Sequence, residues 1–143
     1  MSLASWKKEF YPSEANTIKT RIGAIKHSLR KWVGALPKNL KKHKVELREG
    51  RILEPRDYWD AFVFNSDNCA LCQLYFDFYL SEGDDHCLKC PLYALLNNTR
   101  CYGMVGLGEP DRPFELLYDD NPNPMIALLR KALKVEQKKG AKK

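Results

Sequence analysis

The sequence predicts a mainly helical α+β fold: a single small domain, stapled by a four-cysteine zinc site and carrying a short β-hairpin. Apolar residues recur at helical spacing near both ends of the chain, brief alternation follows the first helix, and two C-x2-C pairs lie in the middle. The length of 143 residues suits one domain with one modest core. With 29% charged and 11% aromatic residues, the composition excludes a disordered chain.

A basic amphipathic helix is predicted over residues 13–36, with Ser13 as its N-cap, because apolar residues recur every three or four positions. Its apolar face is formed by Ile18, Ile22, Ile25, Leu29, Trp32 and Leu36. Gly34 is expected to weaken the last turn, and Pro37 is expected to end the helix. The lysines between these positions are expected to face solvent.

Three segments are predicted to lack regular structure. They are a loosely held tail over residues 1–12, a short basic connector over 38–44 and a basic tail over 138–143.

A second helix is predicted over 124–137, directly before the basic tail, with Asn123 at its cap and a proline at its first turn.

Residues 45–64 are predicted to form a hairpin and a further strand. Short alternating runs flank Glu49 and Gly50, which places a hairpin turn there. The aromatic-rich run that follows suits a strand or a helical turn, and we favour a strand over 59–64.

A zinc module is predicted over residues 68–101. Cys69 and Cys72 form one C-x2-C pair, Cys87 and Cys90 form a second, and 14 residues separate the pairs. A tight turn across each pair directs both thiolates at one point, so two pairs complete the tetrahedron that structural zinc prefers. Each pair is also expected to open a helix, whose dipole stabilises thiolates.

Alternatives to this assignment remain open. Cys101 could replace one of the four ligands or be a buried thiol, whereas His86, next to a ligand, is expected to stay out of the metal shell. Four cysteines with a Cys-Pro step also fit an iron–sulfur cluster, which we consider less suited than zinc to two evenly paired turns. A redox-active pair is less favoured, because no βαβ pattern surrounds either one.

Charge is strongly segregated along the chain. Residues 1–51 carry 13 Lys and Arg against 4 Asp and Glu, residues 52–120 carry 4 against 13, and residues 121–143 carry 7 against 1. All five cysteines lie in the acidic block. Two outcomes are open: the blocks neutralise one another in the fold, or the basic segments form a binding face.

The basic segments supply candidate contacts to nucleic acid. Binding would be dominated by the phosphate backbone and sensitive to salt, with Trp32, His43 and Tyr11 available for stacking. The candidate phosphate contacts are Lys26, Arg30, Lys31, Lys38, Lys41, Lys42 and Lys44.

Several function classes are disfavoured. Four thiolates would close the shell of a zinc ion, whereas a catalytic zinc keeps an open position, and no P-loop, dinucleotide fingerprint or deaminase motif occurs. We therefore do not expect an enzyme. No apolar run is long enough for a signal peptide or a membrane helix, so a cytoplasmic protein without membrane contact is expected.

The cysteine run, Cys69-Ala70-Leu71-Cys72 followed by Cys87-x-x-Cys90-Pro91-Leu92 and Cys101, resembles small phage and prophage proteins of unassigned function. The resemblance covers about 35 residues, gives Cys101 a place in the pattern, and implies a phage-encoded accessory protein in the bacterial host cytosol. The expected function is recognition of a host or phage protein, as an inhibitor or adaptor. Binding of DNA or RNA through the basic helices is the alternative.

Overall fold

The computed structural model describes residues 2–64, 68–75, 90–95 and 121–141. The helices are α1 (Leu3–Phe10), η1 (Ala15–Thr17, a 3-10 turn), α2 (Arg21–Val33), α3 (Pro37–His43), α4 (Ala70–Tyr75), α5 (Pro91–Leu95) and α6 (Asn123–Ala141). The strands are β1 (Glu46–Arg48), β2 (Arg51–Glu54) and β3 (Asp57–Val63). The predicted class, α+β and mainly helical, is confirmed for these residues.

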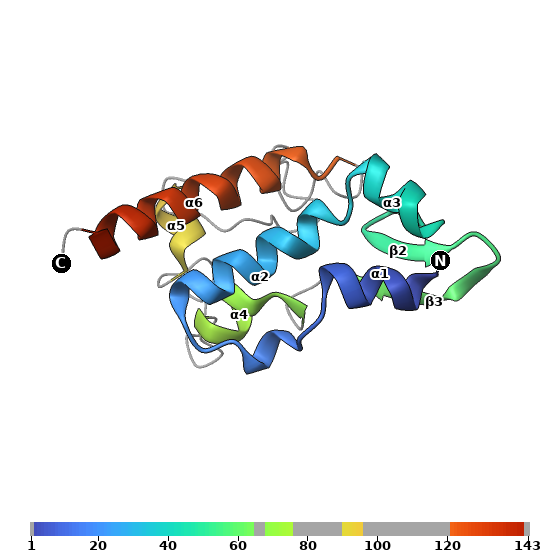
Figure 1. Cartoon of the computed structure of the whole chain (residues 1–143), viewed down its shortest axis with the longest axis horizontal. Helices are drawn as coiled ribbons and strands as arrows, with labels where there is room; N and C mark the ends of the chain where they lie inside the picture. Colours follow the sequence, from blue (N-terminus) through green and yellow to red (C-terminus); the bar gives the residue numbers. More distant parts are fainter. Residues whose placement is uncertain (1, 65–67, 76–89, 96–120, 142–143) are drawn as a thin grey trace, which may run out of the picture.

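Helix α2 runs through the middle of the molecule (Figure 1). Helix α6 lies along one side of it, and α1 and α4 pack against it from the other side. The sheet and α3 occupy the end near the N-terminus, and α6 carries the C-terminus to the opposite end. Helix α5 packs on α6, so both short helices of the cysteine region lie against the long ones.

The strands form one antiparallel sheet in the order β1-β2-β3. The β1–β2 hairpin turns at Glu49 and Gly50, where the sequence predicted it, and both residues have positive φ, 51° and 77°. Two consecutive positive φ values are typical of the two-residue turn whose twist matches that of a hairpin. Strand β3 begins two residues before the predicted strand 59–64 and pairs with β2, which leaves β3 at the edge of the sheet.

Helix α1 occupies the segment that the sequence predicted to be a loose tail, so the prediction for residues 1–12 is wrong. Ser2 and Ser5 form a capping box at its start: the Ser5 N–H donates to Ser2 Oγ at 3.2 Å, and the Ser2 N–H donates to Ser5 Oγ at 2.8 Å. Leu3, Trp6 and Phe10 share one face of the helix and are buried. The cap and this apolar face together account for a helix of only eight residues.

The predicted helix over 13–36 is divided into η1 and α2. Thr20 caps α2, because its side chain accepts a hydrogen bond from the Gly23 N–H at 3.1 Å. Ser13, the predicted cap, instead contributes its backbone carbonyl, which accepts from His27 Nε2 at 2.6 Å. The helical face is therefore shorter than its apolar spacing suggested.

Pro37 begins a helix instead of ending one. A proline fits the first turn because the N–H that it lacks would make no intrahelical bond there. The connector predicted over 38–44 is consequently helical through His43, and Lys44 ends it in the left-handed region with φ 56°.

Helix α6 covers the predicted segment 124–137 and continues to Ala141, through part of the predicted basic tail. Residues 142–143 lie outside the described residues. Helix α6 begins at Asn123, so Asn123 is its first residue and not the predicted cap; the Asn121 side chain accepts the Asn123 N–H at 3.2 Å. In the part of the chain that the structure describes, no helix is long and apolar enough to cross a membrane.

The core joins α1, α2, α6 and the sheet. Trp6 is completely buried and donates its indole N–H to the Gly34 carbonyl at 2.9 Å. Its ring lies 5.2 Å from that of Phe62 and 6.3 Å from that of Phe64, both from the end of β3. This aromatic cluster fixes α1 over the sheet and α2, and so positions the surfaces described next.

Candidate metal and binding sites

The first cysteine pair lies where α4 packs against α2. Cys69 immediately precedes α4 and Cys72 lies within it. Ala70 and Leu71, the two residues between them, are buried in the core, which anchors the turn. The two thiols consequently come to the same point beside α2, as the C-x2-C spacing predicts.

The surroundings of Cys69 favour its thiolate form. The pKa of the Cys69 thiol falls to about 5, mainly because the Cys72 thiol donates a hydrogen bond to the Cys69 sulfur. Burial opposes the shift, whereas the positive charge of Lys31, the Cys72 backbone N–H and the Ser28 hydroxyl add to it. Ser28 Oγ lies 4.0 Å from the Cys69 Sγ. A thiolate in this environment could bind a metal ion at neutral pH without the free-energy cost of first losing a proton.

Lys31 is not a surface lysine, contrary to the prediction. Its relative exposure is 0%, and its Nζ donates to the Asn68 carbonyl at 2.8 Å and to Asn68 Oδ1 at 3.1 Å. The ammonium also lies 5.1 Å from the centre of the Phe64 ring. These contacts turn Lys31 away from solvent, so it is unavailable to a nucleic-acid phosphate.

The second cysteine pair is only partly described. Cys90 lies directly before α5 and is half-buried against the core, whereas Cys87, Cys101 and His86 fall outside the described residues. Cys69, Cys72 and Cys90 are all reduced thiols. Among the described ranges, no three His, Cys, Asp or Glu side chains form a group that could hold a metal ion.

The residues present at the first pair fit half of a structural zinc site. A zinc thiolate needs a deprotonated sulfur and N–H donors that stabilise it. Cys69 has both, since its pKa is lowered and the Cys72 N–H donates to its sulfur. Cys69 and Cys72 would supply two ligands, and the second pair the other two.

The remaining phosphate candidates are on the surface of α2 and α3. The exposed ones are Lys26, Arg30, Lys38, Lys41, Lys42 and Lys44. Lys42 contacts both carboxylate oxygens of Glu9, at 2.8 and 3.1 Å, and Arg30 Nε donates to the Glu9 carbonyl. Part of this positive charge is therefore already neutralised by α1.

The three residues considered for base stacking are in or against the core. Trp32 has 2% relative exposure, and Tyr11 is half-buried with its ring 4.9 Å from that of Phe62. His43 is buried, with its ring packed edge-on against Phe10 at 5.8 Å. Trp32 and His43 therefore offer no face to a base, whereas Tyr11 is only partly covered.

His43 connects Ser5 and Glu9 in an arrangement that superficially suggests a catalytic triad. Its Nδ1 lies 2.8 Å from Ser5 Oγ and its Nε2 lies 2.7 Å from Glu9 Oε1. However, the Ser5 hydroxyl donates its one proton to the Ser2 carbonyl at 2.8 Å. The Ser5 oxygen also accepts the Ser2 N–H, Ser5 is only partly exposed, and His43 is buried. The network ties the start of α1 to the end of α3.

The outer face of β3 is the feature that the sequence reasoning missed. Trp59 is 89% exposed and Val63 is 37% exposed, whereas Phe62, of opposite parity, is buried. Alternation over residues 62–64 could have indicated the exposure of Val63, because it lies between the buried Phe62 and Phe64. The register irregularity of β2 and β3 between Asp57 and Ala61 interrupts this alternation at Trp59. Large apolar side chains that a fold leaves in solvent on an edge strand are candidate anchors for a partner.

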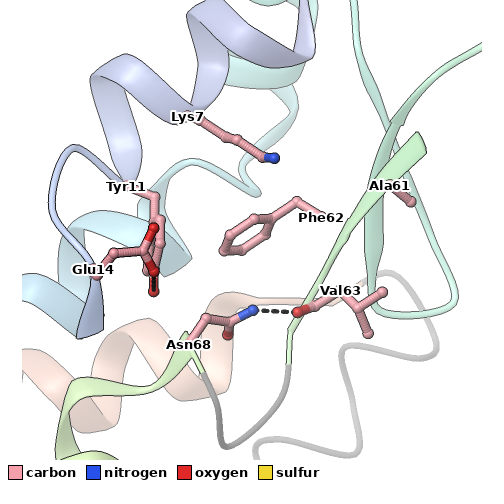
Figure 2. A pocket seen from close by; sticks show the side chains of 7 residues that line it. All are labelled: Lys7, Tyr11, Glu14, Ala61, Phe62, Val63 and Asn68. Carbon is pink, nitrogen blue, oxygen red and sulfur yellow. Dashed lines mark hydrogen bonds between the residues drawn. The ribbon is translucent and has the colours of Figure 1, made fainter. Parts of the chain in front are cut away.

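A shallow hollow of about 360 Å³ lies beside this strand, between α1 and the chain that follows β3. Figure 2 shows Phe62 at its centre, with Lys7 and Tyr11 on the α1 side and Asn68 opposite. The Asn68 amide donates to the Val63 carbonyl, which ties the segment before the first cysteine to the edge of the sheet. The hollow is thus bordered by polar groups and floored by an aromatic ring.

Comparison of the chain with protein-family models, with curated proteins and with solved structures finds no match.

Proposed function

We propose that this chain is a zinc-stapled accessory protein of the phage type, which acts in the bacterial cytosol by recognising a host or phage protein. The zinc, held by Cys69, Cys72, Cys87 and Cys90, has a structural role: a closed four-thiolate shell fixes the cysteine segment against the helices and offers no open position for catalysis. The partner protein is recognised through side chains that the fold leaves exposed.

The observation that carries the proposal is the exposure of Trp59. A tryptophan that is 89% exposed on an edge strand costs apolar hydration in the isolated protein, and burial against a partner recovers it. Val63, also in β3 and 37% exposed, adds a second exposed apolar side chain. Tryptophan is among the residues that dominate binding energy at protein interfaces.

Nucleic-acid binding is the second candidate, favoured by the exposed cations of α2 and α3. The burial of Lys31, Trp32 and His43 weakens it, because one candidate phosphate contact and two stacking rings are lost to the core. What remains is a lysine-rich surface partly neutralised by Glu9. Such a surface would bind any polyanion weakly, with an affinity that falls steeply as salt increases.

The test is affinity capture from a bacterial lysate, with and without nuclease, using the wild-type protein and a Trp59→Ala variant. We expect a protein that is retained after nuclease treatment and whose affinity falls about 30-fold in the variant, the equivalent of about 2 kcal/mol for an interface anchor. Asp60→Ala, an exposed change on the same strand, is the matched control and should retain the partner. Loss of all captured material with nuclease would favour nucleic acid instead.

A further inference from the structure

Lys31 occupies an unusual place for a lysine. It lies in α2 with 0% exposure, and Ser28, one turn earlier on the same face, and Ala24, two turns earlier, are also buried, as is Ala35 just after the helix. Removing an ammonium group from water costs several kcal/mol unless hydrogen bonds and negative charge compensate it. The groups that contact Lys31 therefore indicate which part of the molecule its positive charge stabilises.

The hydrogen bonds of Lys31 end on the residue that precedes the first cysteine. Its Nζ holds both the backbone carbonyl and the side-chain oxygen of Asn68, at 2.8 and 3.1 Å. Asn68 is also fixed from the other side, through its amide bond to the Val63 carbonyl. The entry to the C-x2-C turn is consequently held between α2 and the end of β3.

Two side chains of α2 border the first cysteine. The Lys31 ammonium is hydrogen-bonded to the residue directly before Cys69, and Ser28 Oγ, one turn earlier on α2, lies 4.0 Å from the Cys69 Sγ. A zinc ion with four thiolates carries a net charge of −2, and a buried cation beside one sulfur offsets part of that charge.

We propose that Lys31 is a positioning residue of the zinc site: its buried ammonium fixes Asn68 at the start of the Cys69–Cys72 turn and compensates the negative charge of the metal-bound sulfurs. This inference rests on the proposed zinc site and deepens it. It assigns to α2, which contributes no ligand, a direct part in metal retention.

The test compares zinc affinity in the full-length protein and three variants, by competition with a chromophoric chelator. Lys31→Met removes the charge and the hydrogen bonds, Lys31→Gln keeps a donor of similar reach without the charge, and Lys26→Met alters an exposed lysine of the same helix. We expect zinc affinity to fall about 10- to 100-fold in both Lys31 variants, the range measured for groups that support metal ligands. Lys26→Met should match the wild type.

Two further measurements separate this role from a purely structural one. The metal-free Lys31→Gln variant should unfold at nearly the same temperature as the metal-free wild type, because the glutamine amide can still donate a hydrogen bond to Asn68. In the cobalt-loaded protein, the sulfur-to-metal charge-transfer band should shift in both variants. If Lys31→Met does not fold, Lys31→Gln alone provides the comparison.

The outcomes distinguish this inference from the assignment beneath it. A wild-type protein that takes up no zinc or cobalt overturns the zinc site and this inference with it. A wild-type protein that binds one zinc per chain, with unchanged affinity in Lys31→Gln, overturns the role of the Lys31 charge and leaves the site intact.

Discussion

At the scale of the residue, Gly34 shows how a correct local observation can have a different cause. The sequence suggested a weak last turn, and Gly34 is indeed the residue that follows α2. Its backbone is ordinary right-handed helix, φ −59° and ψ −22°, so no conformational freedom is needed there. What the position requires is the absence of a Cβ, which would lie 2.7 Å from Phe10 Cγ and 2.8 Å from Trp6 Cζ2.

We therefore predict that Gly34→Ala destabilises the protein by about 2 kcal/mol, in the range for overpacking a core. Helix propensity alone would give the opposite sign, since alanine is favoured over glycine in helical backbone. Urea unfolding measures the difference, with Lys26→Ala, an exposed change in α2, as the control expected within about 0.5 kcal/mol. A Gly34→Ala protein that is more stable than the wild type would show that α1 is not packed as described.

Lys31 marks the limit of residue-level prediction. The apolar face predicted for this helix is largely correct, since Ile25 and Trp32 are buried and Leu29 packs against the core. A second face is also buried, and it consists of small residues together with His27 and Lys31. Small side chains allow α4 to approach α2 closely, but nothing in a lysine's chemistry distinguishes a buried position from a solvated one. Lys31 is buried because the fold brings Asn68 and Cys69, which are distant in sequence, next to it.

At the scale of the element, strand pairing and the longest helix were predictable, and the short helices at the N-terminus were not. The Glu49-Gly50 turn and the α6 start depend on turn and cap chemistry within a few residues. Helix α1 depends on contacts with Gly34 and Phe62, which are distant in sequence. Such tertiary contacts stabilise a helix of eight residues that would be marginal alone.

The contact of α2 with α6 includes an ion pair between Arg21 and Glu136, with Nε 2.9 Å from Oε1 and the Glu136 side chain only 11% exposed. Burial raises the pKa of Glu136, but the hydrogen bond and charge of Arg21 outweigh it, so the pKa is lowered. A carboxyl whose pKa is lower in the folded state adds stability above its ordinary pKa. That stability is lost as the pH falls through its folded pKa.

We predict that Glu136→Gln reduces the free energy of unfolding at pH 7 by about 1–2 kcal/mol, between the values for exposed and fully buried pairs. The difference from the wild type should begin to shrink once the pH falls below the ordinary carboxyl pKa of about 4.3, because the unfolded chain then binds a proton, and it should be lost below the lower pKa of the folded state. Urea unfolding at pH 7 and pH 3 measures both values. Glu46→Gln, which breaks the exposed pair with Arg48, is the control and should change little at either pH. An equal cost of Glu136→Gln at both pH values would contradict the ion-pair explanation.

At the scale of the whole molecule, the ion pairs found between described residues follow the order of the charge blocks only in part. They join the basic head to itself, as in Glu9 with Lys42, the head to the tail, as in Arg21 with Glu136, and the tail to itself, as in Lys139 with Glu136. Contact between the basic head and the cysteine segment takes the form of Lys31 beside Asn68 and Cys69. The C-x2-C spacing could predict that Cys69 and Cys72 lie together, but not that a basic helix would lie behind them.

The metal proposed for this site would couple the stability of the whole molecule to chelation. A structural zinc contributes folding free energy on the order of 10 kcal/mol. Because α4 packs on α2 and α5 packs on α6, loss of the metal would also weaken the packing of these long helices. We expect the purified protein to contain zinc and not iron by elemental analysis, and a strong chelator to lower its thermal midpoint. Cys72→Ser and Cys90→Ser should lower the midpoint to a similar extent, and the chelator should have little further effect on either variant. A metal-free wild-type protein that unfolds cooperatively, at a temperature unchanged by chelator, would contradict the assignment, because the cysteine segment would then be held by packing alone.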